Sequence, residues 1–375
     1  MAAAHKDRVV ASLIRGVAAQ MKAAGVAVVS ARAALQGRNP DGTFAVSAGG
    51  QEFTARFVLL CTGSQAAIPP IPGIREALQS GFAVTSRELL ERTEAPARLV
   101  VIGGGVIGLE MASYFRSAGS QVTVVEMLEE IGGGIDGDMA AVLRKNYEKA
   151  GVVFHTGARV ESLENGRVLA ACKEGPQALE ADCVLVCTGR RPALEGAGLE
   201  TVGVLTQDGR IPADEYGRTN IPGLYAAGDV LGRYMLAHAA YREGEVCVSH
   251  MLGKEDAMSY RAIPSVIYTS PEAAAVGLTE RQAAEQGRAV KVRRLPLAYS
   301  GRYVAENGMG DGFCKLLTDP QTHTLLGGQM VGPYASECIT AVTALIDKDV
   351  TAEEARKIVF PHPTVCEVFR ECLFG

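Results

Sequence analysis

The hydrophobic and polar positions of this chain follow two periods, which predict a mixture of helices and buried strands. Apolar side chains recur at helical spacing across Asp7–Ala24 and Gly25 follows, so we expect an amphipathic helix that ends there. The run Phe57–Cys61 is apolar throughout and is typical of a strand that is buried on both faces. A further helix is predicted over Leu236–Met251. Helices and buried strands along one chain indicate an α/β protein.

The segment that begins at Arg98 predicts strand–helix–strand units, and therefore a parallel sheet. The dipeptide Ala95-Pro96 ahead of it marks a predicted domain boundary. Strongly β-prone residues later cover 157–187. The predicted elements are a strand from Leu99, a helix from about Gly108, a strand at Gln121–Glu126, a helix at Asp138–Ala150 and a strand at Val152–His155.

The turn after the first of these strands has the spacing Gly-x-Gly-x-x-Gly, formed by Gly103, Gly105 and Gly108. In such a turn the first glycine permits the tight bend, the second lets a pyrophosphate approach, and the third lets the helix pack closely on the strand. Glu126 ends the next strand, 18 residues after Gly108, where an acid binds a ribose 2′-hydroxyl. A carboxylate there repels the 2′-phosphate of NADP, and residues 127–130 contain no arginine. The sequence therefore predicts an NAD site.

Two distant segments of the chain repeat one another. Val58–Gly63 has the sequence VLLCTG, and Val184–Gly189 has the sequence VLVCTG. Two buried strands can share a composition by chance, but the common Cys-Thr-Gly ending favours a repeat. The second copy closes the domain that Gly103 opens. The first copy is then expected to close a related nucleotide-binding domain whose opening strand, glycine loop and helix are not found in this sequence.

A third motif, Thr219–Asp229, predicts a turn, a short apolar strand and the dipeptide Gly228-Asp229 at its carboxyl end. Ligands of open α/β sheets bind outside the carboxyl ends of the strands, so Asp229 is expected to accept hydrogen bonds from a polyol. The N-terminus of the helix predicted at Leu236–Met251 is expected to face a flavin or a phosphate. Outside this context, Gly-Asp would be an ordinary turn with a side-chain cap.

Composition narrows the class of protein. The chain has 375 residues, enough for two or three domains with cores of their own. The formal net charge is −5 and no long basic run occurs, which argues against a nucleic-acid partner. No window approaches the ~20 apolar residues of a membrane span, and the first ten residues are too polar for a secretory signal. Nine scattered cysteines, an odd number, indicate a reducing cytoplasm rather than a disulfide framework.

In these motifs the chain resembles the flavin-dependent, class I pyridine nucleotide-disulfide oxidoreductases, and among them most closely the dihydrolipoamide dehydrogenases. The resemblance extends through the whole chain, and the motifs come in the family's order. The matching motifs are Gly103–Glu110 with Glu126, TGRRP at Thr188–Pro192, Thr219–Asp229, MLAH at Met235–His238, PSVIYT at Pro264–Thr269 with Pro271-Glu272, and HPTVCE at His362–Glu367.

The resemblance implies two Rossmann-like domains with doubly wound parallel sheets, the first of them incomplete, and a C-terminal α+β dimerisation domain. It implies FAD and NAD as cofactors with no metal, a redox disulfide, and a homodimer. It divides the chain into the remainder of an FAD-binding domain (1–95), an NAD-binding domain (96–215), a returning FAD-binding segment (216–258) and an interface domain (259–375). Its NAD residues are Gly103, Gly105, Gly108, Glu110, Glu126 and Gly189, and its FAD residues are Thr62, Gly63, Arg190, Gly228, Asp229, Met235, Leu236, Ala237 and His238.

The resemblance further implies that the chain oxidises dihydrolipoamide to lipoamide with NAD⁺, and that its partners are lipoyl domains of 2-oxo acid dehydrogenase or glycine cleavage complexes. His362 and Glu367 are the expected catalytic pair. A dithiol attacks a disulfide only as a thiolate, and histidine is suited to take the proton near neutral pH. A carboxylate five residues on can hold the imidazole in one tautomer. By resemblance, His362 serves the disulfide of the partner subunit. A histidine near a terminus is otherwise more often structural.

The sequence departs from the family in its first redox centre. It contains no glycine loop for the FAD pyrophosphate ahead of Val58, and no two of its cysteines have the spacing Cys-x4-Cys. The resemblance places Met1 just after the disulfide helix, so we expect a fragment or a truncated form. We expect the polypeptide 1–375 by itself to hold little FAD and to show no lipoamide-dependent reduction of NAD.

Two other functions remain open at this stage. The first is a sibling flavoprotein, such as a mercuric reductase, a glutathione-type reductase or a transhydrogenase. Glu126 counts against the NADP-preferring reductases, and the pair of His362 and Glu367 counts against a transhydrogenase without a dithiol step. The second is a non-redox module that binds NAD or dimerises, which would have to tolerate exposed strand edges and core.

Overall fold

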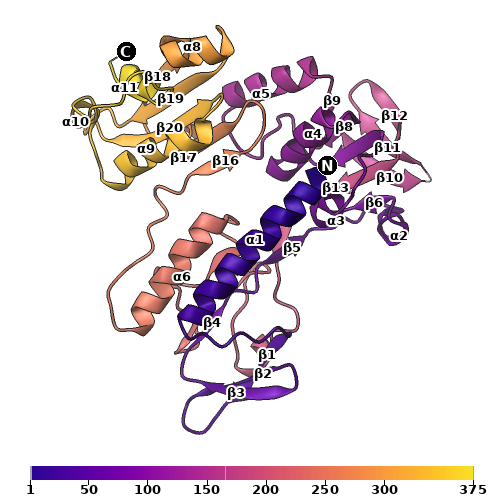
Figure 1. Cartoon of the computed structure of the whole chain (residues 1–375), viewed down its shortest axis with the longest axis vertical. Coiled ribbons are helices and arrows are strands. Elements are labelled where there is room, and N and C mark those ends of the chain that lie inside the picture. Colours follow the sequence, from indigo (N-terminus) through magenta and orange to yellow (C-terminus); the bar gives the residue numbers. More distant parts are fainter. Residues whose placement is uncertain (1, 165, 375) are drawn as a thin grey trace. The chain divides into compact units, whose positions relative to one another are not determined.

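The computed structural model describes residues 2–164 and 166–374, and the chain divides into two compact units (Figure 1). Unit 1 contains the residues up to Ala67 together with Leu90–Thr93 and Gly189–Ser259. Unit 2 contains Ile68–Leu89, Glu94–Thr188 and the residues from Tyr260 onward. The four segments predicted from the sequence have other boundaries than these two units and stay predictions.

The first half of unit 2 is a five-stranded sheet in which every strand is parallel to its neighbours, in the order β6-β13-β7-β8-β9. Parallel strands are connected by crossovers, which here include two helices with apolar inner faces. All four residues of β13 are buried, as expected for a strand covered on both sides. The elements are β6 (Ala83–Val84), β7 (Arg98–Ile102), α4 (Val106–Ser117), β8 (Gln121–Glu126), α5 (Gly137–Lys149), β9 (Val153–Thr156) and β13 (Cys183–Val186).

A small antiparallel sheet is inserted between β9 and β13, with the order β10-β11-β12. This sheet and strand β13 of the parallel sheet together account for the β-prone residues 157–187. Two short helices, one on each side of β6 in the chain, lie ahead of β7. The elements are α2 (Ile74–Ser80), α3 (Ser86–Leu90), β10 (Arg159–Glu164), β11 (Arg167–Cys172) and β12 (Gly175–Glu180).

The second half of unit 2 is an antiparallel sheet with the order β16-β17-β20-β19-β18, joined by helices of which α9 is the longest. Phe313 and Val331 of this sheet share one buried cluster with Ile131 and Met139 of the parallel-sheet half, so the two halves have a continuous core. The elements are β16 (Ser265–Ile267), β17 (Ala273–Gly277), α7 (Glu280–Glu285), β18 (Lys291–Pro296), α8 (Gly301–Asn307), β19 (Phe313–Thr318), β20 (Leu325–Val331), α9 (Ala335–Asp347), α10 (Ala352–Ala355) and α11 (Glu367–Cys372).

Unit 1 contains three small sheets and two long helices. Strand β4, the first copy of the repeat, pairs in parallel with β15, and these two strands form a sheet of their own. Strand β5 pairs antiparallel with β14. The elements are α1 (Ala2–Ala23), β1 (Ala33–Arg38), β2 (Phe44–Ala48), β3 (Gln51–Ala55), β4 (Val58–Leu60), β5 (Ser64–Ala66), β14 (Arg190–Pro192), β15 (Leu224–Ala226), the 3₁₀ turn η2 (Gly228–Leu231) and α6 (Ala237–Met251).

The predicted elements occur near their expected positions, with shifted ends. Helix α1 begins at Ala2 rather than Asp7, because the alanines Ala2–Ala4 favour a helix without contributing to the amphipathic pattern. Helix α4 begins at Val106 rather than about Gly108, since Gly105 is its N-cap. No helix among the residues described is both long and apolar enough to span a membrane. The apolar stripe of α1 is exposed, at Val9, Val10, Leu13, Ile14, Val17 and Met21.

Candidate functional site

The glycine turn between β7 and α4 has the geometry that its sequence predicts. Gly103 has a φ of 111°, and a Cβ there would lie 2.5 Å from the carbonyl oxygen of Cys187. A Cβ on Gly108 would lie 2.0 Å from the carbonyl oxygen of Gly103. By contrast, a Cβ on Gly105 would have no heavy atom within 4 Å. Two glycines are therefore required by packing, and the middle one faces open space at the N-terminus of α4.

Glu126 lies at the carboxyl end of β8 and is hydrogen-bonded to this turn. Its Oε2 accepts from the backbone N–H of Gly104 at 2.6 Å, and its Oε1 accepts from the N–H of Leu128 at 2.7 Å. A carboxylate has about four lone-pair sites, so each oxygen can accept a further hydrogen bond from a ribose hydroxyl. The acid and the open side of the turn are thus brought together.

Glu110 lies one turn into α4, and its Oε1 accepts from the backbone N–H of Tyr268 at 3.0 Å. Burial raises the pKa of Glu110, while the hydrogen bond from Tyr268 acts in the opposite direction. The remaining predicted NAD residue, Gly189, belongs to unit 1. Its carbonyl accepts from the N–H of Ala67 at 3.0 Å. The structure therefore joins Glu110 to the glycine turn through one helix and assigns Gly189 to the other unit.

In unit 1, Asp229 follows β15 and forms a cluster with two residues from the ends of β5 and β14. The hydroxyl of Ser64 donates to Oδ2 of Asp229, and Nε of Arg190 donates to Oγ of Ser64 at 2.7 Å. Arg190 Nε lies 4.0 Å from Oδ2 of Asp229, and the aspartate side chain is 24% exposed. This partly exposed carboxylate can accept hydrogen bonds from the hydroxyls of a ligand.

Other predicted flavin residues lie on the same unit. Thr62 and Gly63 follow β4, where Gly63 has a φ of 73°. Gly228 begins η2, and its N–H donates to the buried Glu243 at 2.6 Å. Leu236 is the N-cap of α6 and supplies no side-chain cap. The predicted residues Met235, Leu236, Ala237 and His238 accordingly form the approach to this helix and its first turn.

His362 and Glu367 lie in the loop before α11 and in its first residue. Nδ1 of His362 is 2.8 Å from Oε2 of Glu367. Oε1 of Glu367 accepts from the N–H of Thr364 at 3.4 Å, and Thr364 Oγ1 donates to the carbonyl of Pro361 at 2.8 Å. The imidazole is 79% exposed, whereas the glutamate is 14% exposed. Since a carboxylate only accepts, Nδ1 donates, and Nε2 is left as the basic nitrogen on an exposed ring.

All nine cysteines are free thiols. Cys183 and Cys187, which the sequence places at the two ends of one buried segment, are not bridged. Burial raises the pKa of Cys187 to about 12, which disfavours the thiolate, and its Sγ lies 3.3 Å from the carbonyl oxygen of Gly103 in the glycine turn.

The comparisons with known proteins cover nearly the whole chain. The family description "Pyridine nucleotide-disulphide oxidoreductase" matches residues 2–244, and the dimerisation domain of the same family matches residues 263–373. Dihydrolipoyl dehydrogenase 3 of Pseudomonas aeruginosa is 38% identical over 373 residues, which cover 98% of this chain and 79% of that protein. The mitochondrial dihydrolipoyl dehydrogenase of Caenorhabditis elegans is 36% identical over 92% of this chain and 70% of its own length.

The chain belongs to the pyridine nucleotide-disulphide oxidoreductase family.

Two solved structures of similar proteins agree with this assignment. The crystal structure of LpdA from Mycobacterium tuberculosis has a TM-score of 0.90 at 28% identity, covering 99% of this chain and 82% of that one. The HOCl-induced flavoprotein disulfide reductase RclA of Escherichia coli has a TM-score of 0.82 at 26% identity, covering 93% and 79%. The predicted family and the predicted fold, two nucleotide-binding domains and a dimerisation domain, are confirmed. The chain is a dihydrolipoamide dehydrogenase-like flavoprotein oxidoreductase, as the sequence predicted.

The cofactors of this oxidoreductase family are FAD and NAD, as predicted. The residues around Gly105 fit NAD, because the open space at the helix N-terminus suits a pyrophosphate and Glu126 retains acceptor capacity. The cluster around Asp229 fits the hydroxyls of a flavin nucleotide. The sequence ahead of β4 supplies no second Gly-x-Gly-x-x-Gly for the FAD pyrophosphate.

Three features of the structure were not predicted from the sequence. Ser64, which bridges Asp229 and Arg190, directly follows the repeated Cys-Thr-Gly and could have been suspected from that position. Glu243 had no such signal, because it lies within α6 and no motif marks it. Lys315 stands alone as a charge in the apolar strand β19, which was a usable signal of a buried partner.

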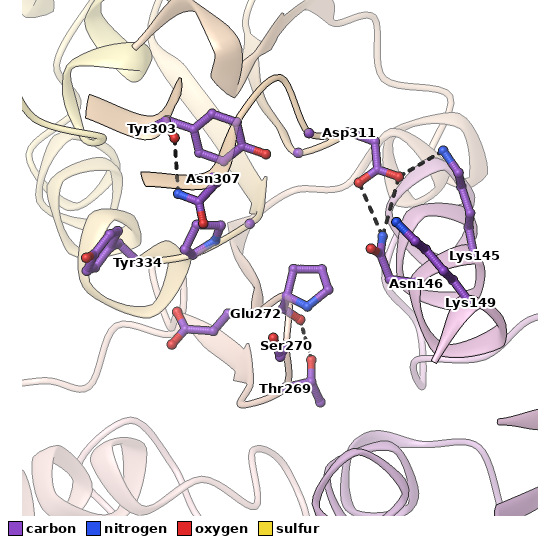
Figure 2. Close-up of a pocket in the computed structure, with 15 residues that line it drawn as sticks. Lys145, Asn146, Lys149, Thr269, Ser270, Glu272, Tyr303, Asn307, Asp311 and Tyr334 are labelled. Atoms are coloured by element: carbon purple, nitrogen blue, oxygen red, sulfur yellow. Dashed lines mark hydrogen bonds and ion pairs between the residues drawn. The ribbon is translucent and has the colours of Figure 1, made fainter. Parts of the chain in front are cut away.

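One pocket of about 730 Å³ lies on unit 2, between the C-terminal part of α5 and, from the antiparallel-sheet half, helix α8 and several loops (Figure 2). Lys145 and Asn146 face it from α5 and both contact Asp311, at 3.0 and 3.2 Å. The residues that line it include side chains of both charges, the amides of Asn146 and Asn307, and the hydroxyls of Tyr303 and Tyr334. None of the predicted site residues lines this pocket.

Proposed function

We propose dihydrolipoamide dehydrogenase as the function, the oxidation of dihydrolipoamide to lipoamide with NAD⁺ as the final acceptor, and we propose that this chain supplies His362 as the base. The observation that carries the proposal is the 2.8 Å contact between Nδ1 of His362 and Glu367. Glu367 holds the ring in the tautomer that leaves Nε2 free to accept a proton from a substrate thiol. The resulting thiolate is the form that attacks a disulfide, but none of the nine cysteines of this sequence forms the redox disulfide that would take up its electrons and pass them to FAD. FAD and NAD, when bound, supply the two-electron transfer.

The side chain of His362 is 79% exposed, which supports a role for it at a site outside its own loop. Residues 263–373 match a dimerisation domain, and we propose that the chain forms a homodimer in which His362 acts on the dithiol site of the partner subunit. Glu367 remains largely buried, so the pair combines an anchored carboxylate with an accessible imidazole.

We assign the NAD specificity to Glu126 and the proposed pyrophosphate contacts to Gly103, Gly105 and Gly108. Glu110 is proposed to lie near the nicotinamide. Asp229, with Ser64 and Arg190, is proposed to bind the flavin nucleotide through its hydroxyls. Each assignment is supported by the open turn, the acceptor capacity of Glu126 and the part-exposed Asp229 cluster.

We further propose that the physiological substrates are lipoyl domains of 2-oxo acid dehydrogenase or glycine cleavage complexes, in the cytoplasm. The support is the name shared by the relatives, dihydrolipoyl dehydrogenase, together with the exposed imidazole, which a tethered lipoyl group could reach.

One alternative has a specific observation in its favour. The similarity to the disulfide reductase RclA, with a TM-score of 0.82, is compatible with a sibling enzyme that reduces a disulfide with a nicotinamide cofactor. LpdA has the higher TM-score, 0.90, and the sequence relatives named above are dihydrolipoyl dehydrogenases.

The substrate profile of the protein, expressed from its complete reading frame, separates the two functions. Initial rates are measured for NAD⁺ with dihydrolipoamide and, in the reverse direction, for NADH or NADPH with glutathione disulfide and with lipoamide. The proposal expects the highest kcat/KM for dihydrolipoamide with NAD⁺. A higher kcat/KM for glutathione disulfide with NADPH would instead identify a sibling reductase.

A further inference from the structure

A segment of three glycines lies against the proposed NAD turn. Gly132, Gly133 and Gly134 follow the buried Ile131, and all three have positive φ, at 92°, 64° and 116°. The N–H of Gly132 donates to the carbonyl of Gly104 at 2.8 Å. A Cβ on Gly133 would lie 3.7 Å from Cα of Gly105 and 3.9 Å from the backbone N of Val106. The triglycine segment, residues 132–134, is thus part of the wall around the N-terminus of α4.

Glycine adopts positive and negative φ about equally well, so three successive glycines have little preference for one conformation. The position of this segment therefore depends on the contacts that anchor it. Ile131 packs in the core on one side. On the other side, Asp136 is 5% exposed and is the N-cap residue of α5. Arg281 holds the segment itself, since its Nη2 donates to the carbonyl of Gly134 at 2.9 Å.

Asp136 receives its hydrogen bonds from the antiparallel-sheet half of unit 2. Oδ2 accepts from Nζ of Lys315 at 2.9 Å and from Nε2 of Gln329 at 2.7 Å. The backbone N–H groups of Glu280 and Arg281, in the first turn of α7, donate at 3.1 and 3.3 Å. Lys315 and Gln329 are directly paired across β19 and β20, so the anchor is part of a rigid sheet.

Lys315 is the centre of this network. Its side chain is 1% exposed, and Nζ also contacts Asp138 Oδ1 at 2.9 Å and Glu280 Oε1 at 2.7 Å. Three carboxylates therefore use all three protons of one ammonium group. Burial alone would lower the pKa of Lys315, but these hydrogen bonds outweigh it and the pKa is raised, so the lysine stays charged.

We propose that Lys315 is a positioning residue for NAD, which acts through Asp136 to hold the triglycine segment against the turn where the pyrophosphate binds. The inference rests on the proposed NAD site at Gly103–Gly108. It makes the antiparallel sheet of the dimerisation domain a determinant of dinucleotide affinity. Removing Lys315 leaves Asp136, Asp138 and Glu280 facing one another, and their repulsion releases the end of the segment.

ADP-ribose is a suitable probe because it carries the pyrophosphate and the ribose hydroxyls but transfers no hydride. Its Kd is measured by titration calorimetry on the purified 375-residue chain, together with the Tm of each variant. K315M should raise the Kd for ADP-ribose about tenfold, which is within the usual range of coupling between two sites in a protein. K315R keeps the charge and should recover part of the affinity. R281M removes a half-exposed side chain that holds Gly134 and should weaken binding about threefold in a chain that folds normally.

The matched control is R288M, which removes another arginine of the same domain from an exposed ion pair with Asp319. It should leave the Kd unchanged. A purely structural lysine would lower the Tm of K315M and leave the Kd of the folded protein at the wild-type value, and that result overturns the proposal. If K315M does not fold, the Kd of R281M for ADP-ribose is the test. An unchanged Kd in R281M then overturns the proposal. If the wild-type chain binds no ADP-ribose, the proposed NAD site is wrong, and this inference is wrong as well.

Discussion

The carboxylate of Glu126 and the backbone N–H of Gly104 are joined by a hydrogen bond of 2.6 Å. This bond fixes the acid at the end of β8 to the turn at the end of β7. One oxygen of the carboxylate therefore supports the turn, while the group as a whole keeps acceptor capacity for a ribose.

The first prediction concerns this acid. Replacing Glu126 by Arg should reverse the preference for NAD over NADP, because a guanidinium attracts the 2′-phosphate that the carboxylate repels. Replacing it by Ala should weaken NAD binding about 10- to 100-fold, as expected for hydrogen bonds to a charged group worth about 1.5–3 kcal/mol. The Kd values for NAD⁺ and NADP⁺ are measured by calorimetry. E129Q is the control, since Glu129 pairs with Lys173 at the surface. An unchanged ratio of the two Kd values in E126R would refute the role of Glu126.

The second prediction separates the glycines of the turn. G108A forces a Cβ to 2.0 Å from a carbonyl oxygen and should lower the free energy of unfolding by about 1–3 kcal/mol or more. G105A places its Cβ in open space with a φ of −75°, so its stability should fall by less than about 1 kcal/mol while NAD binding weakens. Urea unfolding and NAD titration distinguish the two effects.

The control for these substitutions is G244A, in the interior of α6, where a Cβ also meets no atom within 4 Å. It should raise stability by about 0.5–1 kcal/mol and leave NAD binding unchanged. Full NAD affinity in G105A would show that no pyrophosphate approaches this residue.

The third prediction is a pH dependence at Glu110. Burial raises the pKa of this carboxyl above its ordinary value of 4.5. Between the two values the folded protein binds more protons than the unfolded chain, so the free energy of unfolding that Glu110 contributes falls as the pH rises through that window. E110Q should therefore become more stable relative to wild type as the pH rises from about 4 to 7. Urea unfolding at several pH values measures the difference, and a difference that does not change with pH contradicts the prediction.

Much of the fold could be predicted from the sequence because the informative patterns are local. The strand, glycine turn, helix and second strand from Arg98 to Glu126 lie within 30 residues, and their order alone indicates a nucleotide-binding unit. The ends of helices were less predictable. Ala2–Ala4 extend α1 through helix propensity, which has no periodic signal.

The parts of the site that depend on long-range contacts could not be predicted in this way. Lys315 meets Asp136 across 179 residues, and no spacing rule connects them. Ser64 joins Asp229 across 165 residues, so its position after the repeated Cys-Thr-Gly could mark it as a candidate but could not name Asp229 as its partner. His362 and Glu367 could be paired in advance because both belong to the motif that resembles the family and only five residues separate them. Burial of a single charge, as at Lys315, indicates that partners exist without naming them.

The second His–carboxylate pair of the dimerisation domain provides a matched control for the central claim. Nδ1 of His323 lies 3.0 Å from Oε1 of Glu353, at the surface, with the histidine 54% exposed. This pair has the same chemistry as His362 and Glu367, but it lies outside the motif that resembles the family's. Any general effect of losing an exposed histidine should appear equally in both.

The most direct measurement is the rate of NAD⁺ reduction by dihydrolipoamide in the protein expressed from its complete reading frame, compared among wild type, H362Q and H323Q. Loss of a general base typically costs 10²- to 10⁴-fold, so H362Q should lose about that much of kcat. E367Q should lose less, and H323Q should stay within about twofold of wild type, as expected for a surface substitution. Reduction of an artificial acceptor by NADH should survive in H362Q, because that reaction needs no dithiol proton transfer. If H362Q retains the dithiol activity of H323Q, the assignment of His362 as the base is wrong.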